Sequence, residues 1–209
     1  KDSCEVKAAG FNTKPGEGYS YVCQTLDMGI SYYRLVYARL TGEPFVVAET
    51  KNLLIREMTT KDLPELYAVY STLEDCRYIE QLYDYDKELE FTKNYIKNMY
   101  GFFEYGLWLV FEKKSGELIG RAGIENREID GVTCREIGYL IRRDMQHKGY
   151  AYEACQAILE YASDELGIQE MFAVIDKTNE PSRKLAQKLG FELYAQTDGG
   201  PDLYKFVFG

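Results

Sequence analysis

Phosphate-binding chemistry is indicated most directly by one short segment, Gln146-His147-Lys148-Gly149-Tyr150-Ala151. The segment follows a strand-like run at residues 135–142 and begins a helical pattern that extends to Leu166. The first N–H groups of a helix lack partners inside the helix, and the helix dipole places partial positive charge at the same end. Gly149 and Ala151 keep bulky side chains away from the backbone that an anion must approach. The segment, called the 146–151 loop below, therefore predicts a site for a phosphate or pyrophosphate.

The surrounding elements must support this interpretation, because a chain of this size contains a comparable Gln-x-x-Gly-x-Ala spacing by chance roughly 0.2 times. Nearby, Arg142, Arg143 and Lys148 would add positive charge, although a solvated turn is an equally good reading of the three.

Hydrophobic periodicity and turn residues predict the elements that would hold the loop. In chain order they are a strand at 53–58, helices at 63–73 and 86–99, strands at 106–112, 118–125 and 135–142, a helix at 149–166, a strand at 171–175, a helix at 180–189, and strands near 191–196 and 202–208. Turns are expected at 113–117 and at Asp130-Gly131. Hairpins early and strand–helix–strand units late predict an α/β domain with a mixed, mostly antiparallel sheet of about six to seven strands flanked by helices.

The first 50 residues carry no chemical motif and are predicted to form an N-terminal appendage. Residues 1–18 read as a loop or loosely packed arm, residues 19–26 are strand-like, residues 28–40 have helical periodicity, and residues 45–48 form a short apolar run. A remnant of an upstream domain, a dimerisation arm and a lid are all compatible with this pattern, so a homodimer is left open. The expected division is an appendage at 1–50 and a functional domain at 51–209.

Composition excludes several classes of function. The chain has 209 residues, 45% of them hydrophobic, and a formal net charge of −9, which argues against a nucleic-acid partner and tilts toward a cationic one, although solubility explains the charge as well. There is no apolar run of membrane-spanning length and no basic–apolar leader, so neither membrane insertion nor secretion is expected. Five scattered cysteines and a single histidine form no metal-site pattern. A cytoplasmic location without a bound metal is therefore predicted.

Three motifs in chain order resemble the GNAT superfamily of N-acetyltransferases, in particular its branch that includes the ribosomal-protein N-terminal acetyltransferases. The first is the strand Glu136-Ile-Gly-Tyr139 followed by the 146–151 loop. The second is Asn179-x-x-Ser182 at the start of the next helix, and the third is Lys188-Leu-Gly-Phe191 at its end. The resemblance runs from about residue 52 to the C-terminus and does not cover residues 1–50.

This resemblance implies acetyl-coenzyme A as a cosubstrate. Its pantetheine arm would pair with the backbone of the strand that contains Glu136, and its pyrophosphate would lie on the amides of the 146–151 loop. The implied cofactor-binding residues are Tyr139, Leu140, Ile141, Gln146, His147, Lys148, Gly149, Tyr150, Ala151, Asn179 and Ser182. Helix capping explains Asn179 and Ser182 equally well, because Asn is a preferred N-cap residue, and the two roles can coexist.

An amine acceptor requires a base, because freeing the lone pair of a lysine-type amine at pH 7 costs about 4.6 kcal/mol. Glu136 is the first catalytic candidate: alternation places it on the same side of its strand as Gly138 and Leu140, and it matches the position of the catalytic glutamate in many GNAT enzymes. A salt-bridged glutamate at a strand edge is the alternative reading. Glu125, on the preceding strand, is the second candidate, and either could act through water. The family often has a tyrosine acid where this chain has Ala186, so the leaving thiolate would depart unprotonated or take a proton from water.

The sequence thus predicts an acyl-CoA-dependent N-acetyltransferase that transfers acetyl to a primary amine by direct attack on the thioester. A catalytically weak or inactive acyl-coenzyme A binding or regulatory module is the alternative, and Ala186 favours it. The acceptor is predicted to be a small-molecule or peptide amine. Tyrosines at residues 67–105 suggest an aromatic, polar-tipped pocket suited to a cation, although core packing explains most of them.

Overall fold

The structure, a computed structural model, describes residues 33–73, 77–129 and 131–209. It divides into one unit at Lys1–Phe45 and another at Val46–Gly209. The described part of the first unit contains a helix at 33–41, inside the stretch with predicted helical periodicity. The predicted arm at 1–18, the strand-like run at 19–26 and Asp130 of the expected turn lie outside the described residues.

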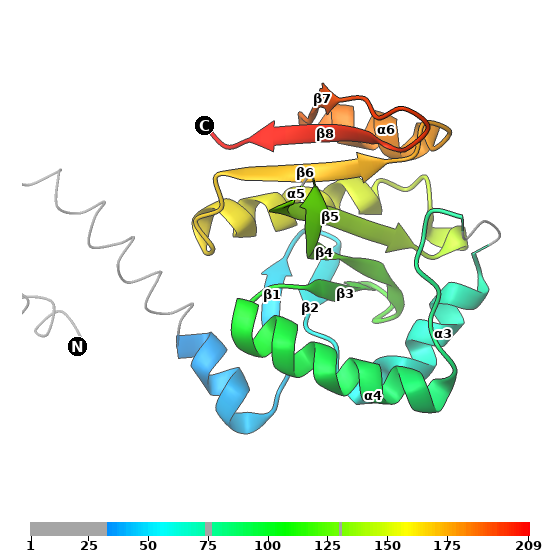
Figure 1. The fold of residues 1–209 in the computed structure, drawn as a ribbon. Helices are drawn as coiled ribbons and strands as arrows, with labels where there is room; N and C mark the ends of the chain where they lie inside the picture. Colours follow the sequence, from blue (N-terminus) through cyan, green and yellow to red (C-terminus); the bar gives the residue numbers. More distant parts are fainter. Residues whose placement is uncertain (1–32, 74–76, 130) are drawn as a thin grey trace, which may run out of the picture. The chain divides into compact units, whose positions relative to one another are not determined.

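One eight-stranded sheet organises the second unit, in the order β1-β2-β3-β4-β5-β6-β8-β7 (Figure 1). Its strands are β1 (Val46–Glu49), β2 (Leu53–Arg56), β3 (Leu107–Glu112), β4 (Leu118–Ile129), β5 (Val132–Ile141), β6 (Glu170–Ile175), β7 (Glu192–Ala195) and β8 (Asp202–Val207). Neighbouring strands are antiparallel except for β5 and β6, which are parallel. The predicted mixed, mostly antiparallel sheet is confirmed.

Helices cover both faces of this sheet. They are α3 (Leu63–Ser71), α4 (Tyr85–Tyr95), α5 (Tyr150–Asp164) and α6 (Glu180–Leu189), with shorter segments η1 (Thr60–Asp62), η2 (Ile96–Phe103) and η3 (Arg143–Met145). Arg121 of β4 donates a hydrogen bond to Tyr70 of α3, so α3 lies on the face to which Arg121 points. On the opposite face, Tyr161 of α5 packs edge-on against Trp108 of β3. These two faces are called the α3 face and the α5 face.

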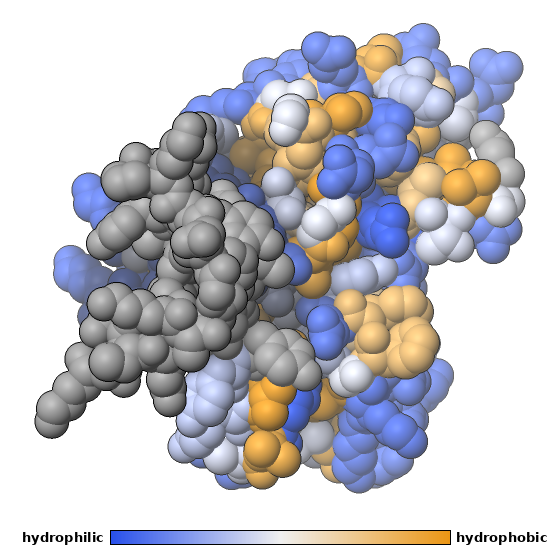
Figure 2. All heavy atoms as spheres, turned by 90° about the vertical axis from the view of Figure 1, so that its left-hand side faces the viewer, coloured by the Kyte–Doolittle hydropathy of each residue, from blue (hydrophilic) through white to orange (hydrophobic). Residues whose placement is uncertain are grey.

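The core of the second unit lies on both faces of the central strands. Trp108, Leu109 and Val110 are consecutive in β3 and all fully buried, as expected for a strand covered on both sides. In β4 the buried run extends from Leu118 to Ile124 and includes one charged residue, Arg121. Over the face shown in Figure 2, hydrophobic residues lie in patches separated by hydrophilic ones.

The strands β5 and β6 diverge, unlike the other neighbours in the sheet. β4 and β5 pair continuously from Gly120↔Ile141 to Ile129↔Val132, whereas β5 and β6 pair at the single position Glu136↔Phe172. Within the described chain, residues 137–141 of β5 therefore have no ladder partner in β6. Backbone groups along this edge are free to pair with a ligand, and the 146–151 loop follows the end of the same strand.

Three elements differ from the sequence prediction. β1, predicted only as an apolar run of the appendage, is the eighth strand, because its four residues become a strand by pairing with β2. β4 continues beyond the predicted end at residue 125, because the polar stretch 126–129 pairs with residues 132–135 of β5. The predicted helix at 86–99 ends at Tyr95 and continues as the π-helical segment η2, which buries Tyr100. The turn predicted at Asp130-Gly131 is a local signal for the longer β4–β5 pairing, whereas β1 becomes a strand only through its pairing with β2.

Candidate functional site

The 146–151 loop has an unusual backbone that leaves amides available. His147 and Gly149 have positive φ angles of 59° and 88°, and Gly149 is the N-cap of α5. A Cβ placed on Gly149 would meet no atom within 4 Å, so the space around it is open. Among the described residues, none accepts a hydrogen bond from the amides of residues 147–151. Unpartnered amides at the start of a helix with open space around them suit an anion.

Gln146 joins this loop to the end of β5. Its side-chain Nε2 donates a hydrogen bond of 2.9 Å to the carbonyl oxygen of Ile141, and its backbone amide donates to the carbonyl of Arg143. One backbone acceptor that the resemblance assigns to the pantetheine, that of Ile141, is thereby used by the protein itself. The side chain of Gln146 thus ties the start of the loop to the end of β5.

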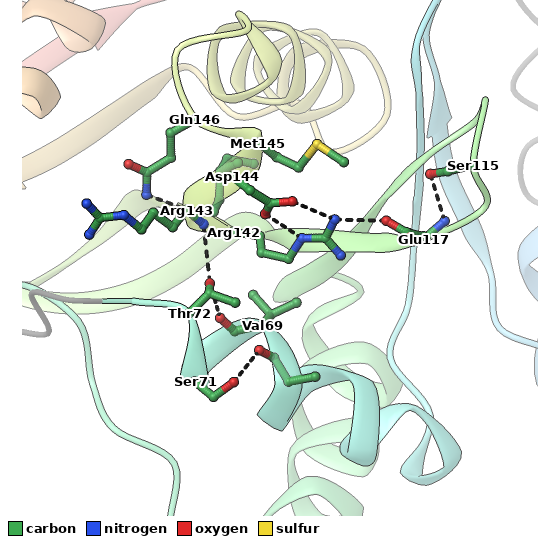
Figure 3. A network of polar contacts seen from close by, with 12 residues as sticks. Val69, Ser71, Thr72, Ser115, Glu117, Arg142, Arg143, Asp144, Met145 and Gln146 are labelled. Atoms are coloured by element: carbon green, nitrogen blue, oxygen red, sulfur yellow. Dashed lines mark hydrogen bonds and ion pairs between the residues drawn. The ribbon is translucent and has the colours of Figure 1, made fainter.

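The charge of Arg142 is compensated within the protein, contrary to the expected concentration of positive charge (Figure 3). Its Nε donates to Asp144 at 2.7 Å and its Nη2 to Glu117 at 2.8 Å. These hydrogen bonds raise the pKa of Arg142. Next to it, the amide of Arg143 donates to the Thr72 hydroxyl, just beyond α3. The positive charge that Arg142 would bring to the loop is therefore balanced by two carboxylates of the protein.

The start of α6 is joined to β5 across the point where β5 and β6 diverge. Asn179 caps α6, because its side-chain oxygen accepts a hydrogen bond of 3.2 Å from the amide of Ser182. The Tyr139 hydroxyl donates to Ser182 Oγ at 2.9 Å. Burial raises the pKa of Tyr139 well above its usual value, so the phenol stays neutral. The structure thus brings Tyr139, Asn179 and Ser182 together, as the resemblance implies.

Glu136 lies at the single paired position between β5 and β6. Its Oε2 accepts a hydrogen bond of 2.7 Å from Arg127 Nε, and its Oε1 accepts one of 3.3 Å from the amide of Val174 in β6. The side chain is 12% exposed. The carboxylate is therefore already engaged by one charged and one neutral donor, and it links the two diverging strands.

Glu125 stands directly opposite Glu136 in the β4–β5 ladder and points to the same face of the sheet. Burial raises the pKa of Glu125, Arg121 opposes this effect, and Glu136 adds to it. Its Oε2 lies 3.1 Å from the position that a Cβ on Gly138 would occupy, so the missing side chain of Gly138 gives it room. Among the described residues, none donates a hydrogen bond to its carboxylate. A half-buried carboxylate with a raised pKa beside an unpaired strand edge is a candidate general base.

Arg121 is a residue of this region that sequence reasoning missed. It is only 7% exposed, and tyrosines from the helical side surround it: Nη1 donates to the Tyr70 hydroxyl at 3.3 Å, and Tyr95 and Tyr100 interact with its charge. Burial raises the pKa of Tyr95 to about 12, which keeps the hydroxyl neutral. The available signal was an arginine within the apolar run 118–124.

The remaining predicted groups take peripheral positions. His147 is exposed in the loop, and Cys134 and Cys155 are free thiols. Burial raises the pKa of Cys155, which makes its thiol a poor nucleophile. In the described residues there is no cluster of three or more His, Cys, Asp or Glu side chains that could hold a metal ion. Within the same residues, no helix combines the length and the apolarity needed to span a bilayer.

The mixed sheet, the two diverging strands and the helix start with open amides are the features that the resemblance to acetyltransferases implies. Residues 52–192 match the family described as acetyltransferase (GNAT) domain. The chain therefore belongs to the GNAT acetyltransferase family, whose activity is the transfer of acetyl from acetyl-coenzyme A. A Bacillus subtilis (strain 168) protein called the uncharacterized N-acetyltransferase YnaD is 33% identical over 143 residues, which are 68% of this chain and 79% of that protein.

Solved structures share the fold at low sequence identity. A GNAT-family acetyltransferase from Bordetella pertussis superimposes with a TM-score of 0.65 at 22% identity, covering 76% of this chain and 97% of that one. RimL, a ribosomal L7/L12 α-N-protein acetyltransferase solved in complex with coenzyme A, gives a TM-score of 0.61 at 16% identity, covering 78% and 97%. At these identities the likeness establishes the fold.

Proposed function

We propose that residues 51–209 catalyse the transfer of an acetyl group from acetyl-coenzyme A to a primary amine of a small molecule or peptide. The observation that carries this proposal is the position of Glu125, a half-buried carboxylate with a raised pKa, beside the unpaired edge of β5 that leads to the open amides of the 146–151 loop. When bound, acetyl-coenzyme A supplies the acetyl group as a thioester.

The residues present fit this cosubstrate. The amides of residues 147–151 would hold the pyrophosphate, because they are unpartnered among the described residues and Gly149 leaves open space around them. The backbone of Tyr139 and Leu140 would pair with the pantetheine arm along the free edge of β5. The side-chain amide nitrogen of Asn179 would add a donor, since only the oxygen of this group is used in capping α6.

Glu125 is the better general base of the two glutamates. The base must accept a proton from the ammonium form of the acceptor amine. A carboxylate with a raised pKa accepts that proton more readily. Glu136 is held by Arg127 and by the amide of Val174, and these two donors occupy its oxygens. We assign to Glu136 the role of holding β5 and β6 together at their point of divergence. Proton transfer from the amine to Glu125, directly or through one water, would then free the nucleophile.

The leaving thiolate has no evident protein acid. Ala186, at the position where the family often has a tyrosine, is 5% exposed and packs in the core. The hydroxyl of Tyr139 is already bonded to Ser182. We therefore infer that the thiolate departs as such or takes a proton from water. The same alanine is the one observation that favours the alternative, a domain that binds acyl-coenzyme A without turning it over.

Incubation of the full chain with acetyl-coenzyme A and a panel of amines tests the proposal. The panel should contain a peptide with a free N-terminus, a polyamine, an amino sugar and an amino acid, with thiol release and the mass of the product as readouts. Acetylation of at least one amine, lost in Glu125→Gln, is expected. If calorimetry shows binding of acetyl-coenzyme A but no amine is acetylated, the result would favour the binding module over the enzyme. If acetyl-coenzyme A does not bind, both hypotheses would be contradicted.

A further inference from the structure

A buried and uncompensated charge lies next to the proposed base. Arg121 is only 7% exposed, its Nη1 has the neutral Tyr70 hydroxyl as a partner, and its Nε has no hydrogen-bond partner in the described chain. No carboxylate of the described residues lies within ion-pair distance of it. Burying an unpaired charge is costly, and an apolar side chain of similar volume would pack at this position without that cost. Packing alone therefore does not account for an arginine here.

Arg121 and Glu125 share one face of β4. Residues two apart in a strand point to the same side, so the residue between them on this face is Gly123, with Gly138 directly opposite in β5. Neither glycine has a side chain, and the carbonyl of Gly106 fills the space over Gly123, since a Cβ there would lie 1.9 Å from that oxygen. No charged side chain of either strand stands between the guanidinium and the carboxylate.

The other charged groups around Glu125 do not replace Arg121. On β4, Arg127 is positive but is paired with Glu136 of β5, and Glu136 itself is negative. Glu80, from the connection between α3 and α4, is also negative. Tyr70 of α3 and Tyr95 of α4 also interact with the carboxylate, and burial raises the pKa of both phenols and keeps them neutral. Arg121 is thus the one uncompensated positive charge among the groups that face Glu125 in the described chain.

We propose that Arg121 is a positioning residue for proton transfer, whose buried charge keeps Glu125 ionised in a half-buried site that the carboxylates of Glu80 and Glu136 make more negative. Burial makes a carboxylate a stronger base but also removes the fraction that is ionised and able to accept a proton. The guanidinium restores that fraction without forming an ion pair that would occupy the carboxylate oxygens. This inference rests on the proposed function of Glu125, and it adds a group that would set the pH range of activity.

The pH profile of kcat/KM for the full chain tests the inference, with one accepted amine as substrate. In Arg121→Met the acidic limb should move to higher pH by roughly one unit, because removal of a nearby opposite charge raises a carboxyl pKa. Activity at a pH on that limb should then fall about tenfold and recover at higher pH. In Arg121→Lys, which retains the charge, the limb should return most of the way to its original pH. The titration of the amine is common to all variants, so differences between profiles report the enzyme.

Two further variants separate the inference from the proposed function. Lys113→Met, which removes an exposed lysine paired with Glu49, should leave the limb in place. Glu125→Gln should remove the carboxyl component of the limb and leave only the component that the amine itself contributes. A carboxyl component that Glu125→Gln abolishes but Arg121→Met does not move would overturn the role of Arg121 alone. A profile of Glu125→Gln with the same carboxyl component as the unaltered chain would overturn both proposals. If Arg121→Met does not fold, Arg121→Gln, which retains hydrogen-bonding atoms, serves for the same comparison.

Discussion

The 146–151 loop and the α3 face of the β4–β5 pair differ in the groups that they offer to a ligand: backbone amides in the loop, and side chains on the α3 face. In the proposed function the loop would bind through backbone amides, whose direction is set by two positive φ angles and one helix start, all within six residues. On the α3 face, the chemistry depends on side chains from β4 and β5 and on tyrosines from α3 and α4. A binding site for a constant group, a pyrophosphate, can be local. A site that must adjust the pKa of a side chain requires contacts from distant parts of the chain.

The largest effect is expected on the α3 face. Glu125→Gln keeps the size of the side chain and removes its basicity, so kcat should fall by about 10²- to 10⁴-fold. The KM for acetyl-coenzyme A should stay within a small factor, because the 146–151 loop is unchanged. Steady-state kinetics with both substrates varied measures the two effects separately.

Glu136→Gln is the matched control, because its carboxylate stands opposite that of Glu125 in the same ladder. It should lower kcat less than Glu125→Gln does, through a weaker link to Arg127 and Val174. A greater loss in Glu136→Gln than in Glu125→Gln would reverse the assignment of the base.

A smaller effect is expected in the loop, and it should change the affinity for acetyl-coenzyme A and leave kcat largely unchanged. Gly149 has a φ of 88°, and a residue with a side chain in the left-handed region costs roughly 1–2 kcal/mol. Gly149→Val should therefore weaken acetyl-coenzyme A binding about 5- to 30-fold, measured by calorimetry, with much of kcat retained at saturating donor. Gly167→Val is the control, because Gly167 has a φ of 61° beyond the other end of α5. Equal losses of donor affinity in the two variants would rule out a specific role for the loop.

The hydrogen bond from Gln146 to Ile141 gives a second test of the loop. A net hydrogen bond contributes about 1 kcal/mol, so Gln146→Ala should raise the donor dissociation constant about fivefold. Gln169→Ala removes a comparable side-chain bond, from Gln169 Nε2 to the Gly167 carbonyl, and should not change donor affinity. Unaltered binding in Gln146→Ala would mean that the loop keeps its position without this bond.

The same contrast explains what could be predicted from the sequence. The 146–151 loop, the N-cap Asn179 and most element positions carry local signals, and the structure joins Tyr139 of β5 to Ser182 at the start of α6. The role of Arg121 and the different surroundings of Glu125 and Glu136 depend on strand register and on which helix covers which face. Those are long-range facts, and β1 and the π-helical segment η2 were missed for the same reason. An arginine inside an apolar strand was the one signal of this kind that a sequence reader could have used.

The smallest expected effect concerns stability, and it distinguishes Glu125, whose pKa is raised, from Glu112, whose pKa is lowered. The pKa of Glu125 is raised in the folded state by burial, so its contribution to stability is present below the unfolded pKa and is lost as pH rises through the folded pKa. Glu125→Gln should therefore raise Tm at pH 8 by a few degrees, with a smaller gain at pH 4.

Glu112 has its pKa lowered by a hydrogen bond from Tyr150, so Glu112→Gln should change Tm in the opposite direction at pH 8, with the difference fading toward acid pH. Thermal melts across pH, read by circular dichroism, measure both. A loss of Tm in Glu125→Gln at pH 8 would show that its carboxylate is stabilised in the fold, which would remove the physical basis for assigning it as the base.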